Sequence, residues 1–288
     1  MLKRREDYTL PAFLVTAVDL NIDIHDFGSI VTTKLAVTPN PAVGGAAMLH
    51  LDGRGLELQS ISVDGKPLAN SDYSHDESGL QISGLTGACV VETTVKCHPE
   101  TNTALEGLYL SGGMYCTQCE PEGFRRIGFY PDRPDVMSIF TVRLEAARAY
   151  PQLLSNGNLI KTGHCGTDRH FAIWHDPHPK PAYLFALVAG TLERVEDSFT
   201  TSSGKQVALH ILVEPGNGHL TGHAMDSLKR SMKWDEDVYG REYDLDLFQI
   251  VAVDDFNMGA MENKSLNVFN AKYVLAKPDT ATDDDYAN

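Results

Sequence analysis

Between two strand-like apolar runs, residues 247–253 and 266–269, lies the stretch Asn257-Met258-Gly259-Ala260-Met261-Glu262-Asn263. Its glycine lets another backbone approach closely, and the carboxylate of Glu262 is a partner for an ammonium group. An extended peptide could add along such an edge by main-chain hydrogen bonds, with Glu262 capping its charged first residue. The alternative is an ordinary strand-to-strand turn rich in Gly and Asn.

The segments before this stretch indicate a domain of mixed helix and strand. Phe199 and residues 207–213 read as a strand pair joined by the turn Ser202-Ser203-Gly204. Apolar residues then recur with the spacing of an amphipathic helix across residues 222–238, namely Ala224, Leu228 and Met232. A long helix after so much strand predicts a second domain of α+β type, residues 193–288.

The longer, earlier part of the chain reads as strands. Short alternating or apolar runs are broken by turn residues about every 8–12 positions, which predicts a β-sandwich-like domain over residues 1–192. We predict hairpin turns at Asp64-Gly65 and Asn156-Gly157, because these residues tolerate positive φ. The apolar run 182–189 predicts a strand covered on both faces or a short link through the core. The clearest strands are residues 30–37, 56–63 and 89–95.

The composition indicates a soluble globular chain of two domains, or of one and a part, at 288 residues. Apolar and charged contents of 42% and 22% are ordinary, and no apolar run reaches the ~18 residues of a membrane span. The net charge of -15 disfavours nucleic acid as a binding partner, because its phosphates would be repelled.

The amino-terminal sequence bears on the location of the protein. Acidic residues and Pro11 stand where a signal peptide would be apolar, so we expect no export signal. Five cysteines then favour reduced thiols and a cytoplasmic location.

A helix start is predicted near the carboxyl end of the chain. Thr282 is a good N-cap, and Asp283, Asp284 and Asp285 place carboxylates at the positive end of a helix. A solvated acidic tail is the alternative interpretation.

The pentapeptide Gly259-Ala260-Met261-Glu262-Asn263 matches, letter for letter, the exopeptidase motif of zinc aminopeptidases of the aminopeptidase N type, which this chain resembles. The resemblance implies an amino-terminal β-sandwich-like domain, residues 1–192, followed by the incomplete first part of a thermolysin-like catalytic domain, residues 193–288. Other segments resemble bacterial members of this family and extend the match over nearly the whole chain: residues 118–125, 132–138, 154–158, 180–190, 264–270, 272–276 and 280–283.

The same resemblance implies a set of substrate-binding residues. Glu120 and Glu262 would bind the α-ammonium group of a peptide, with Gln118 assisting nearby. The backbone of Gly259 and Ala260 would hold the peptide beside the metal, and the flexible Met258 would line the pocket for the first side chain. The full set is Gln118, Glu120, Met258, Gly259, Ala260, Met261, Glu262, Asn263 and Tyr273.

The family places a His-Glu-x-x-His motif on a helix shortly after the stretch that ends here, and this chain lacks it. The two histidines of that motif and a further glutamate beyond it hold zinc, while the glutamate between the histidines activates the zinc-bound water. We therefore expect zinc in the full-length enzyme. In this chain we expect no catalytic residue, no metal ligand, no bound zinc and no activity.

Two other patterns suggest alternative chemistry. His219 and His223 have the spacing of paired helical zinc ligands, but Leu220 stands where the glutamate would be; exposed histidines at a helix start are the alternative. Cys116 and Cys119 have Cys-x-x-Cys spacing, but the surrounding pattern is strand rather than a helix start. We expect both cysteines to be incidental free thiols.

The favoured hypothesis is that the full-length protein is a zinc-dependent aminopeptidase acting on peptides with a free amino terminus. The alternative is a non-catalytic β module that binds peptides or another partner. A third possibility is a family relative with another hydrolytic activity, because one scaffold can host several reactions. No nucleic acid or membrane partner is expected.

Overall fold

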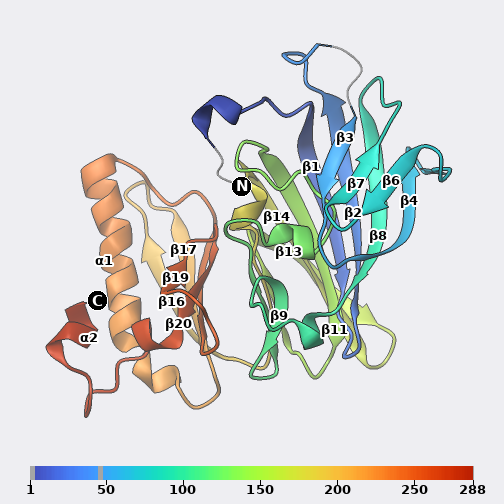
Figure 1. The fold of residues 1–288 in the computed structure, drawn as a ribbon. Helices are drawn as coiled ribbons and strands as arrows, with labels where there is room; N and C mark the ends of the chain where they lie inside the picture. The colour runs from blue at the N-terminus through green and yellow to red at the C-terminus, as the bar shows by residue number, and fades with distance from the viewer. Residues whose placement is uncertain (1–3, 45–47, 288) are drawn as a thin grey trace.

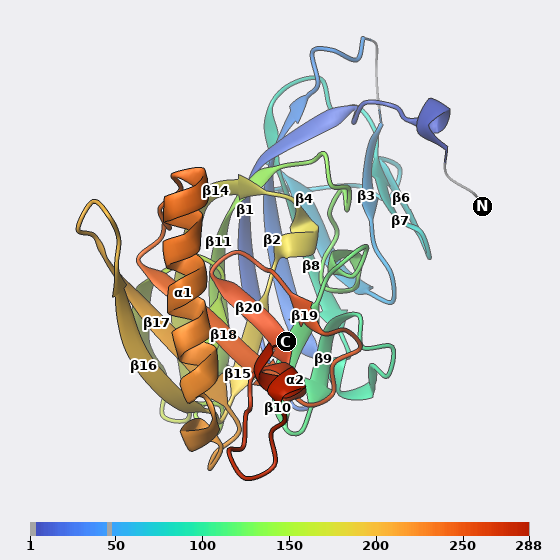
Figure 2. The same cartoon turned by 90° about the vertical axis from the view of Figure 1, so that its left-hand side faces the viewer.

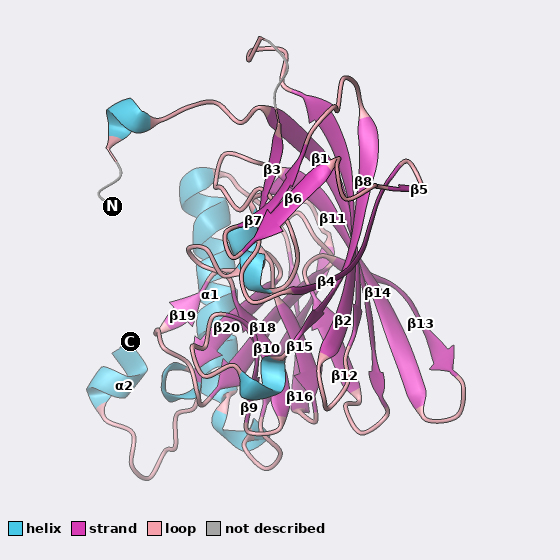
Figure 3. Ribbon diagram, turned by 45° about the vertical axis from the view of Figure 1, so that its right-hand side comes forward, coloured by secondary structure: helices cyan, strands magenta, loops and turns pink. Residues whose placement is uncertain are grey.

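The structure is a computed structural model that describes residues 4–44 and 48–287. Its strands form a large amino-terminal part and a smaller carboxyl-terminal part, in which helix α1 (Gly222–Tyr239) covers one face of a sheet (Figures 1 and 3). The predicted fold class, a mainly β chain that ends in an α+β segment, is confirmed. Within the described residues, no helix is both long and apolar enough to cross a membrane.

The amino-terminal part is built on a large sheet in which β1 and β11 run parallel and the other neighbours run antiparallel. Along β2, buried residues alternate with more exposed ones, as expected for a strand with one face on a core. The strand order of this sheet is β13 (Asn158–Cys165), β14 (Arg169–Lys180), β11 (Ser138–Ala147), β1 (Phe13–Asp23), β2 (Ser29–Pro39), β8 (Cys89–Cys97), β4 (Glu57–Val63) and β5 (Lys66–Pro67).

Two smaller sheets share the core of the amino-terminal part. At its centre the ring of Phe124 packs edge-on against Tyr130, Phe140 and Phe185, with centroids 5.3–6.0 Å apart. Such pairs each add about 0.5–1.5 kcal/mol beyond the area they bury. The smaller sheets have the orders β12 (Gln152–Ser155), β15 (Leu187–Gly190), β10 (Met114–Gln118), β9 (Gly107–Ser111), and β3 (Leu49–Asp52), β7 (Gly79–Ile82), β6 (Tyr73–Asp76).

Only one of the two predicted hairpins forms. Asp64-Gly65 joins the antiparallel pair β4 and β5, and both residues have positive φ. Asn156-Gly157 is a turn, but the hairpin prediction was wrong because β12 pairs with β15 while β13 pairs with β14. The apolar run 182–189 forms a short 3-10 turn and then the fully buried strand β15.

The carboxyl-terminal part contains a mixed sheet that is buried on both faces. Ile250 and Ala252 belong to the core beneath α1, whereas Val251 and Val253 belong to the core of the amino-terminal part. This alternation follows from the period of two along a strand. The order is β16 (Glu193–Thr200), β17 (Gln206–Val213), β18 (Leu247–Val253), β20 (Leu266–Asn270) and β19 (Ala260–Met261), with β17, β18 and β20 parallel.

Helix α1 lies on the outer face of this sheet (Figure 2) and buries Met225, Leu228 and Met232. The predicted helix start at Thr282 is also present: its Oγ1 accepts the Asp285 N–H, and the Asp285 carboxylate accepts the Thr282 N–H. That helix is α2 (Asp283–Ala287). The 3-10 turns are η1 (Arg5–Asp7), η2 (Pro99–Thr101), η3 (Phe124–Arg126), η4 (Ala182–Leu184), η5 (Gly218–Leu220) and η6 (Ala271–Tyr273).

The predicted boundary after residue 192 falls between β15, which ends at Gly190, and β16, which begins at Glu193. The main hydrophobic core continues across this point into β17, β18 and β20. A division into domains at residue 192 therefore stays a prediction.

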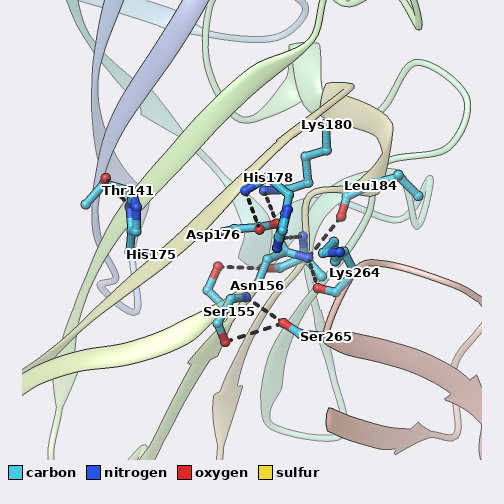
Figure 4. A network of polar contacts seen from close by, with 12 residues as sticks. Thr141, Ser155, Asn156, His175, Asp176, His178, Lys180, Leu184, Lys264 and Ser265 are labelled. Atoms are coloured by element: carbon cyan, nitrogen blue, oxygen red, sulfur yellow. Dashed lines mark hydrogen bonds and ion pairs between the residues drawn. The ribbon is translucent and has the colours of Figure 1, made fainter. Parts of the chain in front are cut away.

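A buried ion pair lies at the end of β14, where the two parts meet (Figure 4). Lys180 Nζ is 3.1 Å from Asp176 Oδ2 and 4.2 Å from the ring centroid of Phe140. The lysine and aspartate side chains are only 2% and 0% exposed. Burial lowers the pKa of Lys180 to about 8, although the neighbouring carboxylate acts in the opposite direction.

Lys180→Met should lower the free energy of unfolding by about 3–5 kcal/mol, because it leaves the Asp176 carboxylate buried without a counter-charge. The double variant Asp176→Asn, Lys180→Met removes both charges and keeps an acceptor for the His178 N–H, so it should recover most of the loss. Urea denaturation of the three proteins measures both effects. A double variant no more stable than Lys180→Met would show that the unpaired charge is not the cause.

Candidate functional site

The predicted pentapeptide contains the edge strand of the carboxyl-terminal sheet. Ala260 and Met261 pair with Phe269 and Val268 of β20, and Gly259 O accepts the Asn270 N–H at 2.9 Å. Because successive backbone groups in a strand point in opposite directions, Ala260 turns its N–H and C=O away from β20, toward the free edge. This edge is the geometry that an added peptide strand requires.

Side chains along this edge alternate between the core and solvent. Met261 is fully buried in the main core, and Glu262 is exposed. Within residues 4–44 and 48–287, the Glu262 carboxylate has no hydrogen bond or ion pair to another side chain or backbone group. Its carboxylate is therefore available to an incoming cation, and its position is set by the backbone on either side.

Three contacts bring strands β9 and β10 of the amino-terminal part to the segment that precedes the pentapeptide. Ser111 Oγ donates to Asp255 Oδ2 at 2.9 Å, and Tyr109 OH donates to the Asp255 carbonyl at 3.2 Å. Gln118 Nε2 lies 3.5 Å from Met258 Sδ. The structure thus brings together Gln118 and Met258, two predicted site residues from different parts of the molecule.

Glu120 lies two residues after the end of β10 and is half-buried. Gln118 Nε2 donates to the Glu120 carbonyl at 3.3 Å, which ties these two predicted residues together. Glu120 also lines a cavity of about 380 Å³ whose other walls include Asp52, Glu106 and Arg125. That cavity belongs to the amino-terminal part.

Gly259 lies against the ring of Tyr273. A Cβ at position 259 would lie 3.1 Å from Tyr273 Cε2, so a larger residue would push the ring away. The side chains of Met258 and Tyr273 are 44% and 45% exposed, and Lys272 Nζ lies 4.7 Å from the Tyr273 ring centroid. An apolar surface of two adaptable side chains therefore borders the edge strand.

Two predicted residues carry buried polar atoms that no described group satisfies. Asn263 is 1% exposed and neither its Oδ1 nor its Nδ2 has a partner, and Gln118 Oε1 also has none. Leaving such an atom unpaired costs about 1–3 kcal/mol. Both residues are therefore places where an additional hydrogen-bonding group would be stabilising.

The sequence did not indicate Asp255, Ser111 or Tyr109. Their hydrogen bonds nevertheless hold in place the segment that precedes the pentapeptide. Asp255 is 144 residues from Ser111, and neither belongs to a recognisable motif. The one sequence feature that could have indicated Asp255 is its position just after the predicted strand 247–253, where a turn can contact a neighbouring sheet.

The structure gives the surroundings of the two alternative patterns. No group of three His, Cys, Asp or Glu side chains in the described residues could hold a metal ion. His223 Nε2 instead contacts the Tyr286 carbonyl at 2.8 Å, and its ring packs edge-on against that tyrosine. Cys116 and Cys119 are buried free thiols, and burial raises the pKa of both, that of Cys116 to about 12.

A large β part precedes a sheet whose edge strand lies between Gly259 and the exposed Glu262, and this arrangement can be compared with known families. Family models agree: the Peptidase M1 N-terminal domain matches residues 13–184 and the Peptidase family M1 domain matches residues 223–288. The chain therefore belongs to peptidase family M1.

Within that family the chain is similar to bacterial aminopeptidases N. It is 52% identical to aminopeptidase N of Caulobacter vibrioides over 97% of its length, and 49% identical to that of Escherichia coli over 99%. It spans 32% of the length of each relative. The crystal structure of Legionella pneumophila aminopeptidase A in complex with aspartic acid matches with a TM-score of 0.95 at 33% identity, covering 99% of this chain and 34% of that one. The predicted order, an amino-terminal β domain and then the start of the catalytic domain, is confirmed.

Thiol titration tests the interpretation of the cysteines. Under denaturing conditions without reductant, all five should react with a disulfide reagent. In the native protein near neutral pH, Cys116 and Cys119 should stay unreactive for hours, because burial excludes the reagent and a pKa near 12 suppresses the thiolate. Finding only three reactive thiols after denaturation would reveal a disulfide and contradict the prediction.

Proposed function

We propose that the full-length protein is a zinc-dependent aminopeptidase that removes amino-terminal residues from peptides. The observation that carries this proposal is the contact between Gln118 and Met258, which brings the strand end leading to Glu120 beside the exposed edge leading to Glu262. This chain would supply the site that recognises the substrate's free amino end.

Recognition would combine backbone pairing with charge. The free N–H and C=O of Ala260 would pair with the backbone of an extended substrate. This pairing would fix the direction of the substrate chain and its register along β19. The Glu262 and Glu120 carboxylates would then hold the α-ammonium group, and a charge-assisted hydrogen bond of this kind contributes about 1.5–3 kcal/mol. A peptide blocked at its amino end would lose this contribution.

The first side chain of the substrate would lie against Met258 and Tyr273. Methionine has three rotatable bonds and a polarizable sulfur, so this wall can adapt to side chains of different shape. The solved relative from Legionella holds aspartic acid, an amino acid of the kind such a reaction releases. We propose that this wall accepts first side chains of more than one shape.

Zinc in the full-length enzyme would polarise the scissile carbonyl and activate a water molecule. The described residues do not fit a zinc site, because they include no group of three suitable ligands. We propose that the metal ligands and the general base come from sequence outside residues 1–288. The contribution of this chain is to bind the substrate and orient it toward them.

Two alternatives remain to be tested. A non-catalytic peptide-binding or partner-binding module would use the same strand edge without cleaving anything, and a relative with another hydrolytic activity would share the scaffold. For either an aminopeptidase or a binding module, we propose that the partners are peptides with a free amino terminus. We propose no nucleic acid or membrane as a partner. Because all five cysteines are free thiols, we also propose a cytoplasmic location.

Glu262→Gln in the full-length enzyme should lower kcat/KM for an alanyl amide by roughly 10- to 150-fold, because glutamine keeps the shape but not the charge. An inhibitor that carries a free amino group should lose affinity, and one that lacks it should bind both proteins almost equally. Kinetics and melting temperature should be measured on the same preparations.

Glu236→Gln is a control outside the site, since this glutamate lies on α1, on the opposite face of the sheet, where its carboxylate accepts hydrogen bonds from Ser202. It should leave kcat/KM unchanged. If Glu262 only completes a turn, Glu262→Gln would instead lower the melting temperature and leave the kinetics per folded molecule unchanged. That result would remove the main support for the proposal.

The 288-residue chain alone should bind far less than one equivalent of zinc and should not hydrolyse an alanyl chromogenic amide, because ligands and base are lacking. Elemental analysis after purification without added metal, with an activity assay, checks both expectations. A full equivalent of zinc with turnover would contradict them and direct attention to His219 and His223.

A further inference from the structure

Asn156 links the amino-terminal part to the turn that directly follows the pentapeptide. Its side chain is only 1% exposed. Its Nδ2 donates to the carbonyl oxygens of Lys264 at 2.7 Å and Leu184 at 3.0 Å, while its Oδ1 accepts the Ala186 N–H at 2.8 Å (Figure 4). Both amide hydrogens and the amide oxygen are thus satisfied. The hydrogen bond to Lys264 connects residues 108 positions apart.

The neighbouring residue makes a second contact with the same turn. The Gly157 N–H donates to Ser265 Oγ at 2.5 Å. A Cβ on Gly157 would lie 2.1 Å from the His175 carbonyl oxygen, and its φ is +89°. Only glycine can therefore bring this N–H to Ser265. We call Asn156, Gly157, Lys264 and Ser265 the Asn156 cluster.

The cluster holds a backbone conformation that the turn would not adopt easily without support. Ser265 has a φ of +62°, in the left-handed region. This conformation is unfavourable for a residue with a side chain, because its Cβ comes too close to the following carbonyl oxygen. Lys264 also pairs with Asp244, but that pair is partly exposed, and such pairs contribute little. The buried hydrogen bonds of the cluster are the stronger restraint.

The position of Glu262 depends on this restraint because its own side chain contacts nothing that would hold it. Met261 fixes the backbone on one side by its burial in the core. On the other side, two residues further along the chain, the Lys264 carbonyl is fixed by Asn156. Releasing that carbonyl would let the Glu262 backbone shift without breaking the strand pair β19–β20.

We propose that Asn156 is a positioning residue for the amino-end recognition site, acting through the Lys264–Ser265 turn on the Glu262 carboxylate. This inference rests on the proposed aminopeptidase function. It extends that function to a residue that contacts no substrate and comes from the amino-terminal part. The amino-terminal part would then set how tightly the free amino end is held.

The test is Asn156→Asp in the full-length enzyme. Aspartate keeps an acceptor for the Ala186 N–H but replaces the two donated hydrogens with an oxygen that faces the Lys264 and Leu184 carbonyls. We expect KM for an alanyl amide to rise about 10-fold with kcat changed no more than about 3-fold, the size expected for one buried hydrogen bond. Affinity for an amine-bearing inhibitor should fall similarly, and affinity for an amine-free one should not.

Asn40→Asp is the matched control. Asn40 is also a buried asparagine whose Nδ2 donates to a carbonyl, that of Pro11 at 2.8 Å, and whose Oδ1 accepts the Ala42 N–H at 3.1 Å. It lies just after β2, outside the site. It should lower the melting temperature as Asn156→Asp does and leave KM unchanged. If Asn156→Asp does not fold, Ser265→Ala removes the other hydrogen bond of the cluster and should raise KM in the same direction.

A double-mutant cycle shows whether Asn156 acts through Glu262. In a Glu262→Gln background, Asn156→Asp should change KM less than about 2-fold, because the charge it positions is already gone. An equal effect in both backgrounds, or equal loss of affinity for amine-bearing and amine-free inhibitors, would overturn the inference. If Glu262→Gln alone leaves the kinetics unchanged, the proposed function fails instead, and the two failures are thereby distinguished.

Discussion

The five-stranded sheet must be covered on both faces, and the rest of the structure depends on this requirement. Its middle strands β17, β18 and β20 run parallel, and parallel strands are stable mainly where both faces are buried. Helix α1 covers one face, and the other face is covered by the amino-terminal part, whose core includes Val251 and Val253. The amino-terminal part therefore covers one of the two faces of this sheet.

The proposed recognition site depends on the same arrangement. The segment that leads into the edge strand β19 is held by hydrogen bonds from Tyr109, Ser111 and Gln118 of β9 and β10. Neither part contains the full set of predicted binding residues. The predicted binding residues come together only because the sheet packs on the amino-terminal core.

Local sequence was sufficient to predict most elements and insufficient to predict how they pair. The alternating or apolar runs that became β2, β8 and β18 were visible, as were the helix at 222–238 and the positive φ at Asp64-Gly65. The types of residues 156 and 157 indicate a backbone bend and carry no information about which strands pair. The hairpin prediction for Asn156-Gly157 was wrong for this reason. The sheets that β12 and β13 join depend on distant partners. For the same reason the pentapeptide could be found by resemblance, whereas the contacts of Asp255 and Asn156 across more than one hundred residues could not.

The two-sided burial of the five-stranded sheet also limits how such proteins can be recombined. A chimera that joins the amino-terminal part of one relative to the carboxyl-terminal part of another would bring together two surfaces that never evolved in contact. Side chains at positions such as 251 and 253 would then meet a core with the wrong shape. Successful crossovers should therefore retain matched residues on both sides of this contact, and sequence exchange should be easier on the α1 face, where the helix and the strands it covers come from the same segment.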